Sequence, residues 1–242
     1  MPTTPTIDIR RAADRFETRA GWLDSRHCFS FSTHYDPENT HHGLLLVSND
    51  DVVQAGTGFM THPHRDMEIV TWVLDGELEH KDTIGNHDII YPGLAQRMSA
   101  GTGIWHSEMN PRGDHEVHFI QMWVLPDTES IDPGYQQLDI RSELAKGGLV
   151  PIASGRGHDH AITIRQQGAA LWVARLGPGE TVAVPDARFA HVYVARGDVA
   201  FEGAGDLAAG DAVRLTAAGA PSIAAGDGGA EVLIWEMANA IG

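Results

Sequence analysis

The chain carries Thr61-His62-Pro63-His64-Arg65-Asp66-Met67-Glu68, a stretch that places two histidines and two carboxylates at alternate positions ahead of a strongly apolar run. Alternate side chains of an extended strand point to the same face. We therefore expect His62, His64, Asp66 and Glu68 to share one face of a strand, with the two imidazoles directed at one point.

A second stretch, Gly101-Thr102-Gly103-Ile104-Trp105-His106-Ser107-Glu108, again has a histidine and a carboxylate two positions apart. His106 and Glu108 should therefore share a face in the same way. Three imidazoles and a carboxylate suit a divalent first-row metal, and ligand type does not select among Fe(II), Mn, Co, Ni, Cu and Zn. The spacing also leaves Glu68 and Glu108 both open as the carboxylate ligand. Solvated strand histidines are the alternative, but two separate strands would then share one spacing by chance.

Composition limits the class of protein. With 242 residues and 42% hydrophobic content, the chain can bury a sizeable core. A formal net charge of -16 argues against direct binding to nucleic acid or to acidic membranes, because phosphates would be repelled. A single cysteine, Cys28, excludes an intrachain disulfide. The start of the sequence has no signal-peptide pattern and no run reaches the roughly 20 apolar residues of a membrane helix, so we expect a cytoplasmic protein.

Short strand-like segments dominate the first half. Leu44 to Ser48 and Asp51 to Gln54 are expected as two strands with an Asn49-Asp50 turn between them. Asp75-Gly76 is a strong signal for a two-residue hairpin after the apolar strand 68–74. Many short strands separated by Gly and Pro predict an all-β fold, as an antiparallel sandwich or barrel.

The second half resembles the first but lacks its histidines. Strand-like runs resume beyond Val150, and the turn at Gly197 resembles that at Gly76. Counting back from Gly197 as far as His62 and His64 lie from Gly76 reaches Ala183 and Pro185, whose side chains cannot bind a metal. The expected domains are an N-terminal metal-binding domain at residues 1–135, a linker at 136–150 with a short helix, and a C-terminal domain without metal ligands at 151–242.

Other histidines and reactive residues are expected to have ordinary structural roles. His158 and His160 repeat the His-x-His spacing in a glycine-rich run, but no second His-x-Glu pair accompanies them, so they predict a loop. His191 stands alone in an apolar strand and is expected as a core or edge histidine rather than as a ligand. Loop positions are expected for His34, His41 and His42, core positions for Cys28, Trp105 and Met109, and an ion pair at the pocket rim for Arg65 with Asp66.

The spacing of these histidines, acids and glycines resembles that of the cupins. The general first cupin motif is a glycine, His-x-His, a glutamate and a further glycine, which Gly56, His62, His64, Glu68 and Gly76 match with one extra residue before Gly76. The second motif is looser here. His106 and Asn110 keep its spacing, whereas Gly101 stands where a proline is usual.

The resemblance is closer to the pirin-like two-domain cupins. It is carried by His-Pro-His at residues 62–64, by Ser-Ala-Gly-Thr-Gly-Ile-x-His-Ser-Glu at 99–108 and by Gly-Trp-Leu-Asp-Ser at 21–25. The family implies two tandem cupin domains of the double-stranded β-helix, or jelly-roll, type. It also implies a mononuclear metal site with ligands His62, His64, His106 and Glu108, and so favours Glu108 over Glu68.

Some bacterial pirin-like proteins are quercetin 2,3-dioxygenases. The resemblance therefore implies a flavonol and O2 as substrates, opening of the heterocycle with release of carbon monoxide, and one divalent metal per chain, with Fe(II) favoured. Glu108 is expected to be the catalytic residue, as ligand and as proton acceptor. A second interpretation is based on eukaryotic pirin, an iron-loaded, redox-responsive regulator that acts through a protein partner. A third is a structural or stress-related cupin that merely retains its metal. The sequence does not indicate an oligomeric state.

Overall fold

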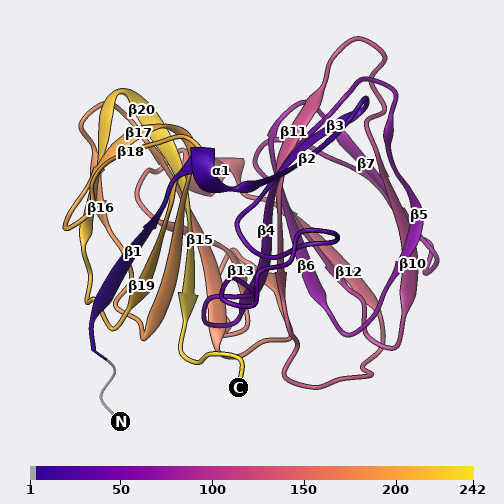
Figure 1. Cartoon of the computed structure of the whole chain (residues 1–242). Helices are drawn as coiled ribbons and strands as arrows, with labels where there is room; N and C mark the ends of the chain where they lie inside the picture. The colour runs from indigo at the N-terminus through magenta and orange to yellow at the C-terminus, as the bar shows by residue number, and fades with distance from the viewer. Residues whose placement is uncertain (1–3) are drawn as a thin grey trace.

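The computed structural model describes residues 4–242, whose regular secondary structure consists almost entirely of strands (Figure 1). Residues 1–3, part of the segment considered as a signal peptide, lie outside the described residues. The N-terminal half contains β2 (Phe16–Ala20), β3 (Leu23–His27), β4 (Leu45–Val53), β5 (Gly58–His64), β6 (Glu68–Asp75), β7 (Leu78–Asp82), β8 (His87–Ile90), β9 (Leu94–Ser99), β10 (Ile104–Met109), β11 (Val117–Val124) and β12 (Gly134–Asp139). The C-terminal half contains β13 (Val150–Ser154), β14 (Ile162–Thr163), β15 (Ala169–Leu176), β16 (Thr181–Ala183), β17 (Phe189–Phe201), β18 (Gly205–Ala208), β19 (Ala212–Thr216) and β20 (Ser222–Met237).

The helices are short, as the sequence predicts. A 3-10 turn, η1 (Ala12–Asp14), and one helix, α1 (Arg141–Leu144), account for them within residues 4–242. Among the described residues, no helix is long and apolar enough to cross a membrane. The expected all-β fold is confirmed.

Two sheets form the N-terminal domain. One has seven strands in the order β12-β9-β6-β11-β4-β3-β2, and the other has four in the order β5-β10-β7-β8. A buried apolar cluster with members on both sheets, among them Val53, Val73, Leu78, Ile90 and Phe119, fills the space between them. The four-stranded sheet therefore closes over one face of the seven-stranded sheet.

The other face of the seven-stranded sheet packs against the C-terminal domain. Val70 and Trp72 of β6 belong to the same buried cluster as Leu233 and Trp235 of β20. The indole Nε1 of Trp72 also donates a hydrogen bond of 2.7 Å to Glu231. Strand β6 is apolar almost throughout because both of its faces are buried.

The N-terminus of the described chain crosses to the other domain. Strand β1 (Thr6–Arg10) pairs with β19 in the nine-stranded C-terminal sheet, where Thr6 lies opposite Thr216 (Figure 1). Strand β12, which overlaps the segment expected as a linker, pairs with β9 in the N-terminal domain. Each domain is thus completed by a strand that lies wholly or partly outside the residue range expected for that domain.

The turn expected at Asn49-Asp50 and the hairpin expected at Asp75-Gly76 are both wrong. Asn49 and Asp50 lie inside a continuous β4, where their side chains are held by hydrogen bonds from His27 and His118 instead of forming a turn. Asp75-Gly76 does not close a hairpin, because β6 and β7 belong to different sheets. Gly76 has φ +78° and lies so close to Glu116 and Val117 that a Cβ atom would clash with their backbone. The chain turns here from one sheet to the other.

Asp50 joins three parts of the molecule. Its carboxylate accepts hydrogen bonds from His118 Nε2 at 2.6 Å and from the Tyr193 hydroxyl of the C-terminal domain, and it pairs with Arg15 at 3.3 Å. Burial alone would raise the pKa of Asp50, but its hydrogen bonds and the charge of Arg15 outweigh burial and lower the pKa from 3.8 to about 2. The ionised carboxylate is therefore a stabilising link between the domains.

We expect Asp50→Asn to lower the free energy of unfolding at pH 7 by about 2 kcal/mol, the value of a pKa depression of this size. Since the folded pKa is depressed, this contribution is present above about pH 4 and is lost as the pH falls towards about 2. Urea unfolding of both proteins between pH 7 and pH 3 measures it. Asp75→Asn, which removes an exposed pair with His115, is the control and should change little. An equal loss in the two variants at pH 7 would contradict the assignment.

Candidate metal centre

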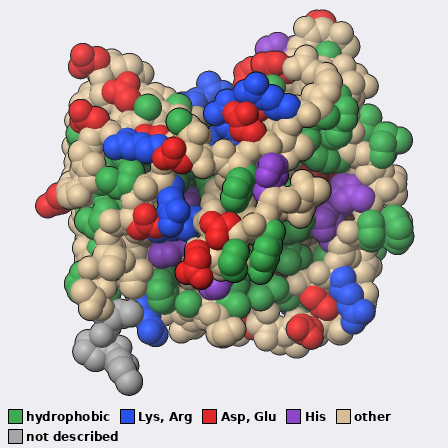
Figure 2. Space-filling view, viewed as in Figure 1, with side chains coloured by type: hydrophobic (Ala, Val, Ile, Leu, Met, Phe, Trp, Pro, Cys, Tyr) green, Lys and Arg blue, Asp and Glu red, His purple; other side chains and the backbone are tan. Residues whose placement is uncertain are grey.

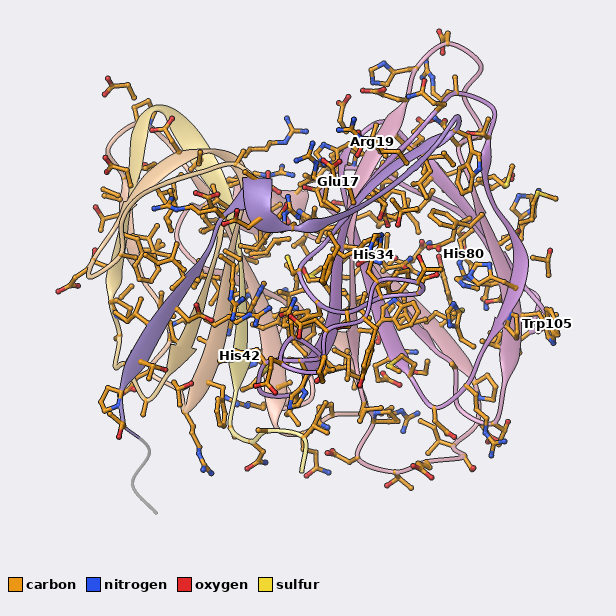
Figure 3. All side chains as sticks on the ribbon, in the orientation of Figure 1. Glu17, Arg19, His34, His42, His80 and Trp105 are labelled. Atoms are coloured by element: carbon orange, nitrogen blue, oxygen red, sulfur yellow. The ribbon has the colours of Figure 1, made fainter. Side chains whose placement is uncertain are left out.

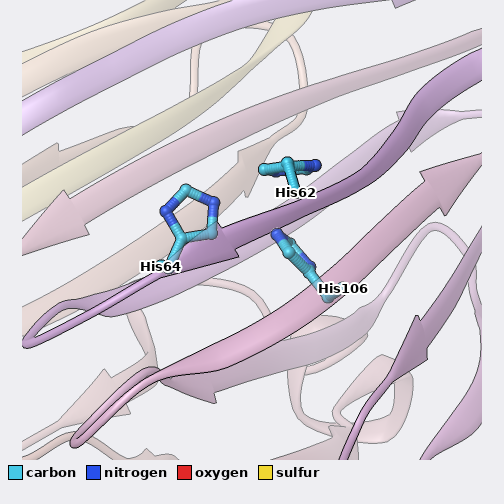
Figure 4. A group of neighbouring side chains, drawn as sticks. All are labelled: His62, His64 and His106. Atoms are coloured by element: carbon cyan, nitrogen blue, oxygen red, sulfur yellow. The ribbon is translucent and has the colours of Figure 1, made fainter.

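Neighbouring antiparallel strands bring the three predicted histidines together. In the pairing of β5 with β10, His62 lies opposite His106 and His64 lies opposite Ile104. The ring centroids are 4.5 Å apart for His62 and His106 and 4.9 Å apart for each of the other two pairs. Figure 4 shows the three rings converging from the two strands. One nitrogen from each ring lies within 4.8 Å of the other two, a spacing that can hold one metal ion.

The nitrogens of this cluster lack protein partners on the side where an ion would bind. Nε2 of His64 and Nε2 of His106 are both buried without a hydrogen-bond partner among the described residues. Nδ1 of His62 lies 2.7 Å from the carbonyl oxygen of Met60. Because a carbonyl oxygen only accepts, Nδ1 must donate, and a neutral His62 then has a free lone pair on Nε2. Buried polar atoms are normally paired, and a metal ion would satisfy these. The residues present therefore fit the metal that the sequence predicts.

Burial keeps the imidazoles of His64 and His106 neutral. It is the main cause that lowers the pKa of His64 to about 4 and that of His106 to about 3, and the neighbouring imidazoles lower both further. A proton therefore does not compete for the lone pairs at neutral pH, and metal ligation requires neutral histidine.

Glu108 lies beside the three histidines and is held by a glutamine. Both of its carboxylate oxygens accept hydrogen bonds from Gln121 Nε2, at 2.9 and 2.8 Å. Trp123 in turn donates to the oxygen of Gln121 at 3.1 Å. Glu108 forms a second close group with His106 and His80 rather than with His62 and His64. Its role as fourth ligand stays a prediction, and Gln121 is a supporting residue that the sequence did not reveal.

Glu68 points away from the histidine cluster, towards Arg97 and Arg165. It is fully buried and accepts a hydrogen bond of 3.0 Å from the backbone of Arg165, with Arg97 at 3.8 Å. The expectation that Asp66 and Glu68 share the face of the two histidines is wrong, because β5 ends at His64 and Asp66 has φ +47°. The predicted ion pair of Arg65 with Asp66 is confirmed at 3.1 Å.

Three other histidines that the sequence singles out, His158, His160 and His191, lie outside the cluster. His158 contacts Ser154 at 2.7 Å and packs on Trp172, and His160 lies in a turn. His191 is buried against Phe29, as expected. Within residues 4–242, the groups spaced to hold a metal all lie in the N-terminal domain.

A cavity of about 530 Å³ adjoins the cluster and includes His62, His64 and Glu108 in its wall. Aromatic side chains form much of the remaining wall, namely Trp22, Phe31, Phe59 and Trp123. Polar side chains of β3 and β4 face it as well, namely Ser25, His27, Asn49 and Asp51. Figure 2 shows histidines in a hollow of the surface bordered by hydrophobic side chains. Volume and lining are typical of a site for a small aromatic molecule.

Trp105 is not in the core. Its side chain is 51% exposed, and Figure 3 shows it projecting from the outer surface of the domain. The prediction fails because side chains alternate along β10: Ile104, His106 and Glu108 point inward, so Trp105 must point outward. Met109 is only partly buried. Cys28 is buried as predicted, and burial raises the pKa of its thiol.

Comparison with known proteins agrees with this geometry. Residues 9–124 match the family model described as Pirin, and residues 151–237 match the quercetinase C-terminal cupin domain. A Mycobacterium tuberculosis protein named "Putative quercetin 2,3-dioxygenase Rv0181c" is 58% identical over 240 residues, covering 99% of this chain and 98% of its own. The chain belongs to the pirin family. It therefore has the two cupin domains that the sequence resemblance implies.

Further relatives of this pirin come from Escherichia coli. The quercetin 2,3-dioxygenase of strain K12 is 38% identical over 232 residues, which is 96% of this chain and 98% of that protein. The crystal structure of the bacterial pirin YhhW from Escherichia coli in complex with nickel(II) matches with a TM-score of 0.88 at 36% identity, over 98% of this chain and 100% of that chain. These similarities and the histidine cluster support a single transition metal in this pirin.

We expect His62→Ala to lose most of the bound metal, because one of three convergent nitrogens is removed from the cluster. Metal content is best measured by mass spectrometry on protein purified without a histidine tag. His158→Ala, which alters the loop histidine outside the cluster, should keep the wild-type content. Full metal content in His62→Ala would contradict the assignment.

Proposed function

We propose that this pirin is a metal-dependent dioxygenase that opens the heterocycle of quercetin-like flavonols with O2 and releases carbon monoxide. The observation that carries the proposal is the convergence of three imidazoles, two of them with unpartnered buried nitrogens, beside an aromatic-lined cavity whose wall includes His62 and His64. The relatives named quercetin 2,3-dioxygenase support the substrate class. Fe(II) stays our proposed ion, although the related Escherichia coli structure contains nickel(II).

His62, His64 and His106 would hold the ion, with Glu108 as predicted fourth ligand. When bound, the metal would supply Lewis-acid and redox chemistry to the flavonol and O2. The protein's own contribution begins with the cavity, whose aromatic walls suit a flat substrate and reduce its contact with water. The polar side chains of β3 and β4 could bind the hydroxyl groups of the substrate.

Glu108 is placed to accept the proton of a flavonol hydroxyl. Glu108 lines the cavity, and the two hydrogen bonds from the Gln121 amide fix the orientation of its carboxylate. A second carboxyl, Asp51, lines the same cavity, and burial raises its pKa to about 7 against a hydrogen bond with Ser25 that lowers it. Glu108 lies next to His106, whereas Asp51 belongs to neither group of described residues spaced for a metal, so Glu108 is the stronger candidate for the proton acceptor.

We expect Glu108→Gln to lower quercetin turnover by about 100-fold or more, the usual contribution of a positioned general base. Oxygen uptake and carbon monoxide release are to be measured at equal metal content, since loss of metal would hide the effect. If Glu108→Gln retains metal and full turnover, the base role is wrong. If fully loaded wild type takes up no O2 with any of a panel of flavonoids and phenols, a pirin that merely retains its metal is favoured instead.

A regulatory role is the second candidate, and the exposed indole of Trp105 favours it. Trp105 directly precedes His106 on β10, so a partner that covers the indole would contact the strand that carries a metal ligand. Capture of binding proteins by the ferrous and the ferric form tests this role, and equal capture would count against it. Cytoplasmic location stays a prediction from the sequence.

A further inference from the structure

His80 lies behind the metal centre and contacts one of its ligands. It belongs to β7, which pairs with β10, and its side chain is fully buried (Figure 3). Its Nδ1 lies 3.5 Å from Nδ1 of His106, and its Nε2 lies 3.1 Å from a carboxylate oxygen of Asp82. The three side chains form a row that leads from Asp82 through His80 to His106.

The Asp82 end of this row is fixed. One carboxylate oxygen accepts hydrogen bonds from the backbone nitrogens of Ile84 and Asn86, at 3.0 and 2.9 Å, and the other accepts from the side-chain nitrogen of Asn86 at 2.8 Å. Burial alone would raise the pKa of Asp82, but the hydrogen bonds from Asn86 and His80 lower it overall. An ionised carboxylate only accepts hydrogen bonds, so His80 Nε2 must donate to it.

The hydrogen bond to Asp82 determines which ring nitrogen carries the proton in His80, and through His80 in His106. A neutral His80 that carries its proton on Nε2 has a lone pair on Nδ1. A hydrogen bond across the 3.5 Å gap then requires the proton on His106 Nδ1, which leaves the lone pair of His106 on Nε2. Nε2 of His106 is the nitrogen that is buried without a partner. The row of hydrogen bonds and the unpartnered Nε2 of His106 therefore indicate the same tautomer of His106, with its proton on Nδ1.

The ring of His80 is also held in place. Tyr135 of β12 stacks on it, with ring centroids 4.8 Å apart and planes 28° from parallel. This contact restricts rotation of the imidazole, so its two nitrogens stay directed at Asp82 and at His106.

We propose that His80 and Asp82 are positioning residues of the metal centre, which hold His106 in the tautomer that presents Nε2 to the ion. The inference rests on the proposed metal centre. Hydrogen bonding behind a metal-binding histidine orients the ring and fixes its tautomer, and loss of such a partner typically weakens metal binding by about 10- to 100-fold.

The spacing of His80, His106 and Glu108 also permits a different arrangement, in which His80 is itself a ligand. An ion between His80 and His106 would bind Nδ1 of His106 and so require its proton on Nε2. The two arrangements therefore predict opposite tautomers of His106.

The tautomers can be measured on metal-free wild type. Long-range proton–nitrogen NMR correlations of ¹⁵N-labelled protein report which ring nitrogen carries the proton. We expect the proton on Nδ1 of His106 and on Nε2 of His80. A proton on Nε2 of His106 would overturn the proposal. This result does not depend on metal loading, on activity or on the folding of any variant.

Metal affinity provides the second test, with Ni²⁺ as the probe and a competing chelator on tag-free protein. His80→Phe and Asp82→Asn should bind Ni²⁺ about 10- to 100-fold more weakly than wild type. His80→Gln should recover part of the loss, because its side-chain oxygen can accept from His106 Nδ1. The matched control is His87→Gln, which alters a histidine–carboxylate pair with Glu79 on the same sheet, and its affinity should not change.

The outcomes separate the two proposals. Wild-type affinity in both His80→Phe and Asp82→Asn would overturn the positioning role, as would equal losses in His80→Phe and His80→Gln, which would show a packing role only. If wild type itself binds no Ni²⁺ or other divalent metal, the proposed function fails, and the NMR measurement still decides the row of hydrogen bonds.

Discussion

The pairing of β5 with β10 is the constraint on which the metal centre depends. Side chains alternate along both strands, so the register that sets His62 opposite His106 also brings all three imidazoles to one face of the strand pair. A slip of one residue would turn His106 outward and Trp105 inward. The register of this pair shifts between His106 and Glu108 because β5 has one extra residue there, whereas the pairing of β10 with β7 continues through both residues without a shift. Glu108 therefore stays on the same face of β10 as His106, where Gln121 donates to its carboxylate.

The C-terminal domain contributes no side chain to the groups of described residues that are spaced for a metal. It supports the site indirectly, through the seven-stranded sheet. Neighbouring residues of β4 serve opposite faces: Asp51 lines the cavity, while Asp50 binds Tyr193 of the C-terminal domain. On β6, Trp72 likewise reaches Glu231. The wall of the cavity is thus supported from behind, which fixes the strands that carry its polar side chains.

The two-residue alternation of side chains and the spacing of turn residues were sufficient to predict the histidine cluster and the fold class. They did not predict the features that depend on the pairing of strands distant in sequence. Alternation brought His62, His64 and His106 to one face, and turn residues indicated an all-β fold. Asn49-Asp50 has turn composition, yet it lies in a strand because residues remote in sequence satisfy its side chains. Likewise, no local signal shows that β1 joins the C-terminal sheet. His80 and Asp82 share the same two-residue spacing as His106 and Glu108, so alternation could have identified them.

The charges around the centre favour a cation. Burial keeps His64 and His106 neutral, and none of the described residues that line the cavity is a lysine or an arginine. The nearby carboxylates Glu108 and Asp82 are held mainly by neutral donors, from Gln121 in the first case and from Asn86 and the backbone in the second. Among the described residues, neither side chain forms an ion pair with a lysine or an arginine. A divalent ion at the three free nitrogens would supply the missing positive charge, so the site is electrostatically incomplete without one.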